Sequence, residues 1–166
     1  MSASASQSAA PPPDTSGPAQ AETKGAVSAT TLDESAALAV RDGFPILAPT
    51  DLPEGWRVES VAYGVEGRGT WEVDMTDAGG AEVAVRQAVP GVPAAYVGDI
   101  ATYLGSGARP VGTVDVPPLG TWDRYEGVRH PRAFAVGQYA GTGVVLWADD
   151  AGSLPVLASL LERPKG

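Results

Sequence analysis

Cysteine is absent from the 166-residue chain, and histidine occurs once, as His130. Without cysteine the chain has no disulfide bond, no thiolate zinc ligand and no cysteine nucleophile, in either a reducing or an oxidising compartment. A catalytic triad or a histidine-ligated metal site would depend on His130 alone. Because His130 lies between Arg129 and Pro131 in a predicted loop, we interpret it as a solvated loop residue.

Basic residues and long apolar runs are also scarce. Eleven lysines and arginines face twenty aspartates and glutamates, which gives a formal charge of -9. Such a chain repels nucleic acid and anionic membrane surfaces, so neither is a predicted partner. No run approaches the roughly 18–20 apolar residues that span a bilayer. The longest uncharged run, Ala133 to Ala148, contains Gln138 and three glycines and predicts a hairpin. We expect the chain as given to be soluble.

The first thirty residues differ in composition from the rest. Residues 1–30 are mostly Ser, Ala, Pro, Thr and Gly, and Val27 is their only branched apolar residue. They cannot offset the entropy cost of ordering, and they lack the basic start and apolar centre of a secretory signal. We predict a disordered stalk, of the composition found between a membrane anchor and a folded envelope domain, with the anchor absent from this chain. Residues 31–166 are predicted to form a single domain.

A helix is predicted over residues 32–42, at the start of that domain. Thr31 can cap it, Glu34 completes a capping box, and Gly43 is placed to end it. Its apolar residues are Leu32, Ala36, Leu38 and Val40.

Alternating apolar and polar residues predict strands in two groups. Trp71, Val73 and Met75, for example, alternate with polar residues, and a turn from Asp77 to Gly80 follows. The predicted strands are Trp56–Val65, Trp71–Thr76 and Val83–Gln87, then Thr113–Val116, Trp122–Val128, Ala133–Ala140 and Val144–Asp149.

A helix is predicted after each group of strands. The first carries Val97, Ile100, Ala101 and Leu104 on one face and ends at Gly105. The second is capped by Ser153 and ends near Arg163, and its buried face comprises Leu154, Leu157, Leu160 and Leu161. The predicted class is therefore α+β, a twisted antiparallel β-sheet with helices packed on one face. The order suggests two β-β-β-α repeats, in pattern and not in residue identity.

Clustered aspartates raise the question of a calcium site. Asp74 with Asp77, and Asp149 with Asp150, supply the oxygen ligands that calcium prefers. Neither pair has EF-hand spacing, and both lie where a turn is predicted. We therefore assign these aspartates to turns and predict no metal site.

Catalytic patterns are equally weak. Gly64, Gly67 and Gly69 precede a strand instead of a helix, so they do not form a dinucleotide loop, and no cofactor is predicted. The run Gly105-Ser-Gly107 follows a helix, whereas a nucleophile elbow follows a strand. Glycan hydrolysis needs a pair of carboxylates, and four acids on predicted strands are available: Glu72, Asp74, Glu82 and Asp123. Glu72 and Asp74 alternate with apolar residues, so we favour a charged, solvated sheet face over a catalytic pair.

Aromatic residues give the strongest hint of a binding surface. Trp71 is predicted to be in the core, whereas Trp147 lies on a strand with apolar residues on both faces. Such a strand is either central in the sheet or part of an exposed patch that a partner covers, and we favour the first. A ligand groove would also draw on Trp56, Trp122, Tyr96, Tyr103, Tyr125 and Tyr139.

Six short segments together resemble the actinobacterial DUF4245 family, a domain of unknown function. They are Pro45–Pro49, Leu52-Pro-Glu-Gly-Trp56, Trp71, Val85-Arg-Gln87, Trp122-Asp-Arg-Tyr125 and Leu154–Leu161. The resemblance covers roughly residues 32–161. It implies an outward-facing envelope protein with one N-terminal transmembrane helix, which would explain the stalk. It carries over no catalytic residue.

Three functions follow from these observations. The first is a non-enzymatic extracytoplasmic binding or interaction module of the cell envelope, with an unidentified protein partner, attached to the membrane only through an anchor absent from this chain. The second is a carrier or sensor of a small apolar ligand held between sheet and helices, in a cavity lined by Trp147, Tyr103 or Leu161. The third is an envelope hydrolase, which needs two acids facing one cleft about 5–10 Å apart.

Overall fold

The computed structural model describes residues 29–64, 69–89, 108–117, 119–127 and 132–164. Four features lie outside the described residues: residues 1–28 of the predicted stalk, the predicted helix that ends at Gly105, Tyr103, and His130. Residues 29 and 30, predicted as the end of the stalk, belong to α1. The elements are α1 (Ala29–Arg41), β1 (Ala48–Pro49), β2 (Arg57–Tyr63), β3 (Thr70–Thr76), β4 (Glu82–Ala88), β5 (Gly112–Val116), β6 (Gly120–Glu126), β7 (Ala133–Tyr139), β8 (Thr142–Ala148), α3 (Ser153–Leu160) and β9 (Leu161–Glu162).

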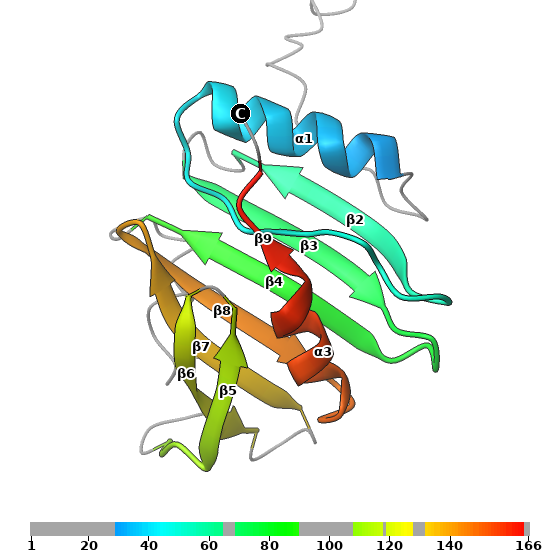
Figure 1. Cartoon of the computed structure of the whole chain (residues 1–166), viewed down its shortest axis with the longest axis vertical. Helices are drawn as coiled ribbons and strands as arrows, with labels where there is room; N and C mark the ends of the chain where they lie inside the picture. Colours follow the sequence, from blue (N-terminus) through cyan, green and yellow to red (C-terminus); the bar gives the residue numbers. More distant parts are fainter. Residues whose placement is uncertain (1–28, 65–68, 90–107, 118, 128–131, 165–166) are drawn as a thin grey trace, which may run out of the picture.

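Seven strands form one antiparallel sheet in the order β2-β3-β4-β8-β7-β6-β5, with α1 and α3 on the same face (Figure 1). The α+β prediction is therefore confirmed, and all seven predicted strands are present with ends within two residues of the predicted ones. Two meanders, β2 to β4 and β5 to β8, join where β4 pairs with β8. The first meander has three strands and the second has four, as predicted, so the suggested β-β-β-α repeats differ by one strand.

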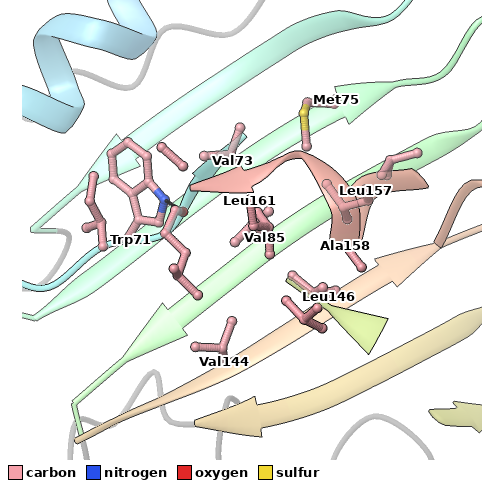
Figure 2. Packing of buried hydrophobic residues seen from close by; sticks show 14 of the residues in the cluster. Trp71, Val73, Met75, Val85, Val144, Leu146, Leu157, Ala158 and Leu161 are labelled. Carbon is pink, nitrogen blue, oxygen red and sulfur yellow. Dashed lines mark hydrogen bonds between the residues drawn. The ribbon is translucent and has the colours of Figure 1, made fainter. Parts of the chain in front are cut away.

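The core lies between the sheet and the two helices. Side chains that alternate along β3, β4 and β8 point to this inner face and meet side chains from α3 and β9 (Figure 2). Because both helices contribute to one continuous cluster, they cover a single core. Its labelled members in Figure 2 are Trp71, Val73, Met75, Val85, Val144, Leu146, Leu157, Ala158 and Leu161.

The segment before β2 crosses this core as an extended strap, which we define as residues 45–49. The buried side-chain amide of Gln87 makes two hydrogen bonds to the strap. Gln87 Oε1 accepts from Leu47 N at 3.0 Å, and Gln87 Nε2 donates to the Pro45 carbonyl. Trp71 Nε1 donates to the Leu47 carbonyl at 3.0 Å. At its end the strap pairs with β9, through the strand β1 that the sequence did not indicate. These bonds satisfy backbone groups that would otherwise be buried without partners.

Helix α1 begins at Ala29, earlier than predicted, so Thr31 lies inside it and does not cap it. The end is as predicted, because Gly43 adopts a φ of 77° and its N–H bonds to the Val40 carbonyl at 2.9 Å. The buried stripe passes through Ala39, whereas the predicted Leu38 is among the exposed apolar residues.

Helix α3 starts at Ser153, but Gly152 occupies the cap position, which corrects the predicted serine cap. The Ser153 hydroxyl donates instead to Asp77 Oδ2 at 2.6 Å. The other oxygen of Asp77 accepts from the N–H groups of Gly79 and Ala81, each at 2.9 Å, which confirms the predicted turn. The helix ends at Leu160 and not near Arg163, because the next two residues pair with β1.

Asp77 therefore joins the β3–β4 turn to the start of α3. The hydrogen bond from Ser153 lowers the pKa of Asp77 below its ordinary value of 3.8, backbone N–H groups add to the effect, and burial opposes it. Because the folded pKa is depressed, ionised Asp77 stabilises the fold above the unfolded pKa. This stabilisation is lost as pH falls through the folded pKa.

The first prediction concerns Gly137, whose backbone supports the Trp122 ring. A Cβ at Gly137 would lie 2.2 Å from two ring carbons, whereas a Cβ at Gly112, also in a strand, would meet nothing within 4 Å. We expect Gly137→Ala to lower the free energy of unfolding by about 1–3 kcal/mol, as overpacking does. Gly112→Ala should change it by less than about 0.5 kcal/mol. Urea unfolding measures both, and equal midpoints for the two variants would contradict this packing.

The second prediction concerns Gln87. Gln87→Met keeps the shape of the side chain but removes the partner of the buried Leu47 N–H, so we expect a loss of about 2 kcal/mol in unfolding free energy. Gln138→Met, at an exposed position of β7, is the matched control and should be near neutral. Hydrogen exchange at the Leu47 amide should accelerate only in Gln87→Met. Unchanged exchange there would show that Gln87 does not hold the strap.

The third prediction concerns pH. Ser153→Ala removes the largest cause of the Asp77 shift, so the pKa of Asp77 should rise toward its ordinary value. Stability at neutral pH should fall by about 1 kcal/mol, and its further loss below about pH 4 should be shallower than in the parent chain. Ser159→Ala is the control, since this exposed hydroxyl of the same helix donates only to the nearby Val156 carbonyl. NMR titration of the Asp77 carboxyl carbon checks the shift; an identical titration in Ser153→Ala would refute its cause.

Candidate functional site

The structure separates two of the three residues predicted to share a ligand cavity. Leu161 is 1% exposed and packs in the core, on the inner side of the sheet. Trp147 is half-buried and, because it alternates with the inner-facing Leu146 and Ala148 along β8, lies on the outer face. These two residues therefore do not line one cavity, and Tyr103 lies outside the described residues. In the described part of the chain, side chains from the sheet, α3 and β9 pack against one another between the sheet and the helices (Figure 2).

Central placement explains why β8 is apolar on both faces. It is the fourth strand of the seven, and Val145 on its outer face is only 1% exposed. Val145 packs with Phe134 and Ala88 in a second, smaller cluster. The central position of β8 is thus observed, whereas Trp147 is half-buried on the outer face and packs at the edge of the smaller cluster.

The strand register lines up one row of side chains across the outer face. In this row, each residue is the directly opposite partner of the next one on the neighbouring strand. The residues on β2 and β3 are polar, the residue on β4 is an alanine, and the residues on β8, β7 and β6 are aromatic. The row is Ser60, Asp74, Ala84, Trp147, Phe134 and Tyr125. Ala84 has the smallest side chain of the row, lies between Asp74 and Trp147, and is 1% exposed.

Arg86 is the buried charge of this face, at 9% exposure. Its Nη2 lies 2.5 Å from Asp74 Oδ1, its Nε lies 3.5 Å from Glu72 Oε2, and its Nη1 donates to the Val85 carbonyl at 3.1 Å. A buried guanidinium is costly unless it is paired and hydrogen-bonded, and these contacts meet that condition. Ser60 extends the network by donating to Asp74 Oδ2 at 2.8 Å.

Trp147 continues this network toward β7. The Arg86 guanidinium carbon lies 4.7 Å from the centre of the Trp147 ring, and that of Arg132 lies 5.1 Å from it, both within cation–π distance. Arg132 also bonds to Asp149 at 2.6 Å and to Glu82 at 2.8 Å. A chain of contacts therefore crosses the outer face from Ser60 to Asp149.

These side chains enclose a surface hollow of about 380 Å³, which we call the Arg86 groove. It lies on the outer face, beside Arg86 and Trp147. Its lining residues are Glu59, Ser60, Asp74, Met75, Thr76, Glu82, Val83, Ala84, Arg86 and Trp147.

A second hollow of about 660 Å³ lies between α1 and the paired strands β1 and β9; we call it the α1 groove. Its floor includes the apolar Leu32, Ala36, Val40, Ala48 and Pro49, and charged residues such as Asp33 and Arg163 also line it.

The acidic residues singled out in the sequence fall into structural roles. Glu72 and Asp74 lie on the outer face beside Arg86, as predicted for a solvated sheet face. Asp123 is exposed on β6. Asp150 serves a turn, since its Oδ1 accepts from Gly152 N at 2.8 Å. Within the described ranges, no group of three or more histidines, aspartates or glutamates is placed to hold a metal ion.

Sequence reasoning missed Arg86, the residue around which this groove is built. A signal was present, because Glu82, Ala84 and Arg86 alternate with the core residues Val83, Val85 and Gln87. A lone arginine on the polar face of a strand is normally solvated, so the pattern alone did not reveal that Glu72 and Asp74 enclose it.

Comparison with known proteins identifies a family and little else. No helix in the described parts of the chain combines the length and the apolar composition needed to cross a bilayer. Searches of curated proteins and of solved structures gave no significant match. The family described as "Protein of unknown function (DUF4245)" matches residues 6–161, which is nearly the whole chain and includes every strand of the main sheet. The chain therefore belongs to the DUF4245 family.

Proposed function

We propose that this domain is a non-enzymatic binding module of the cell envelope, and that its ligand occupies the Arg86 groove. The observation that carries the proposal is the buried Arg86, whose bonds to Glu72, Asp74 and backbone carbonyls fix one wall of a hollow that is open at the surface. A wall held in this way is formed before a ligand arrives, which reduces the ordering cost of binding.

The polar groups of the groove support binding over catalysis. The Asp74 carboxylate bonds to Arg86 and Ser60, and the Thr76 hydroxyl donates to Glu59 Oε1 at 3.0 Å. These contacts hold the carboxylates and hydroxyls of the groove against one another and against Arg86, which is the arrangement of a fixed binding wall. An extracytoplasmic location is part of the proposal; the stalk-like composition of residues 1–30 supports it.

A second candidate, the carriage of a small apolar ligand, is favoured by the α1 groove. Its volume of about 660 Å³ falls in the range of small-molecule sites, and its floor is apolar. The ligand would then lie beside α1 and not beneath it, since Leu32, Ala36 and Ala39 are packed into the core.

The fourth prediction separates the two grooves. Ala84→Val fills the Arg86 groove, and Ala62→Val makes the same change on the outer face of β2, away from the groove lining. We expect a small-molecule extract of the source organism's cell envelope to shift the NMR signals of Ser60, Ala84 and the Trp147 indole. The shifts should persist in Ala62→Val and disappear in Ala84→Val.

Shifts confined to Leu32, Ala36 and Ala48 would replace the proposal with the apolar carrier. Absence of any shift, with the fold intact, would overturn the proposed binding role. Thermal unfolding of each variant confirms that the fold is retained.

A further inference from the structure

The two edge strands of the main sheet, β2 and β5, differ in how they are protected against pairing with another chain. β5 has only five residues, carries Asp115, and is flanked by Pro110 and Pro117. Short length, charge and proline are the usual means by which an edge strand avoids such pairing. The first half of β2 is protected as well, because a register shift lies between Val58 and Ser60.

The second half of β2, from Ser60 to Tyr63, lacks these protections. Its sequence is Ser-Val-Ala-Tyr, without charge or proline, and it pairs with β3 in a regular register. Gly64 N donates to the Thr70 carbonyl, and successive residues of a strand direct their backbone groups to opposite edges. The N–H and C=O groups of Val61 and Tyr63 therefore point away from β3. Among the described residues, no strand pairs with that edge of β2.

An exposed leucine borders this open edge. Helix α1 lies over the β2 end of the sheet (Figure 1), and the α1 groove follows the flank of α1 that faces β1 and β9. Leu38 lies on the other flank, where it lines a separate hollow with Phe44 and Tyr63, and it is 39% exposed. The Tyr63 hydroxyl donates at 3.4 Å to Asp42, one helical turn after Leu38, so this flank lies beside the end of β2. Leu38 and the half-buried Tyr63 thus give the open edge an apolar border.

A second copy of β2 fits this edge when the two strands run antiparallel about a two-fold axis at Ala62. Val61 of each copy then lies opposite Tyr63 of the other, and each pair exchanges both N–H···O=C bonds, because both residues point their backbone groups outward. The pair joins a β-branched and an aromatic side chain on the inner face, a favourable cross-strand combination. The two Ala62 side chains meet at the axis on the outer face, so no like charges lie opposite each other there.

We propose that the Ser60–Tyr63 edge of β2 binds a second copy of this chain and joins the two seven-stranded sheets into one continuous antiparallel sheet. Two-fold symmetry favours a second copy over a foreign strand, because one complementary pair is then made twice. The α1 helices of the two copies lie beside the axis on the inner face, with each Leu38 turned toward the partner. The inference goes beyond the proposed function, since it concerns the sheet edge and not the Arg86 groove.

The fifth prediction concerns Ala62. Ala62→Lys places two ammonium groups opposite each other at the axis, so the dissociation constant of the dimer should rise at least about tenfold. Thr113→Lys makes the same charge change at an exposed position of the other edge strand and should leave the constant unchanged. Sedimentation equilibrium of the full chain measures the constant, and thermal unfolding confirms that each variant is folded.

Leu38 supplies a second, independent variant. Leu38→Ala removes apolar surface that the partner covers, so it should weaken the dimer about fivefold. Val156→Ala, on α3, truncates a side chain of nearly equal exposure, 38%, and should leave the dimer unchanged. Added salt should strengthen the parent dimer, because it screens the repulsion between two copies that each carry a formal charge of -9.

Amide hydrogen exchange, measured by NMR at two protein concentrations, locates the contact. The N–H groups of Val61 and Tyr63 should exchange rapidly in dilute protein and slowly where the dimer forms. The Ala62 N–H, which points toward β3, is the internal control and should be protected at both concentrations.

A dimer that Ala62→Lys and Leu38→Ala weaken, with Val61 and Tyr63 protected, supports the inference. A chain that stays monomeric up to about 1 mM, the limit of weak association, would overturn it and leave this edge to a foreign strand. Equal weakening by Thr113→Lys, or a dimer that leaves both amides unprotected, would also overturn it, because the contact would then lie elsewhere. None of these outcomes decides the proposed binding role, which the envelope-extract experiment tests separately.

Discussion

The pairing of β4 with β8 is the constraint on which the rest of this structure depends. It joins two meanders into one sheet, and β4 is hydrogen-bonded on both edges. Consecutive side chains of a strand point to opposite faces, so the neighbours Arg86 and Gln87 lie on different sides of the sheet. Both are buried and polar, and each organises its own face: Gln87 holds the strap over the core, and Arg86 holds the carboxylates of the outer groove.

This arrangement shows how one strand can stabilise the core on one face of the sheet and build a groove on the other. On the inner face, Gln87 and Trp71 satisfy strap groups that packing alone would leave without partners. On the outer face, the guanidinium of Arg86 keeps Asp74 close while the small Ala84 leaves space beside it. The groove is thus a product of strand register, because Ala84 lies directly between Asp74 and Trp147 in paired strands.

Much of the fold could be predicted from the sequence, because alternation along β3 and the end of α1 at Gly43 are local signals. The candidate site was harder to predict from the sequence, because it depends on which strands become neighbours in the sheet. Trp147 meets Ala84 only because β8 returns to pair with β4, a contact between residues far apart in the chain. The prediction that Ser153 caps α3 was wrong for a similar reason. The Ser153 hydroxyl donates to Asp77, a residue far from it in the chain.

The central claim is that Arg86 is a fixed wall of a preformed groove. Solvent exchange and relaxation of its side-chain Nε–H, measured by ¹⁵N NMR on the ligand-free chain, test this claim most directly. The account predicts slow exchange and order comparable to the backbone of β4, because Nε lies beside Glu72 and Nη2 beside Asp74. Rapid exchange and a mobile guanidinium, as expected for an exposed arginine such as Arg57, would contradict it.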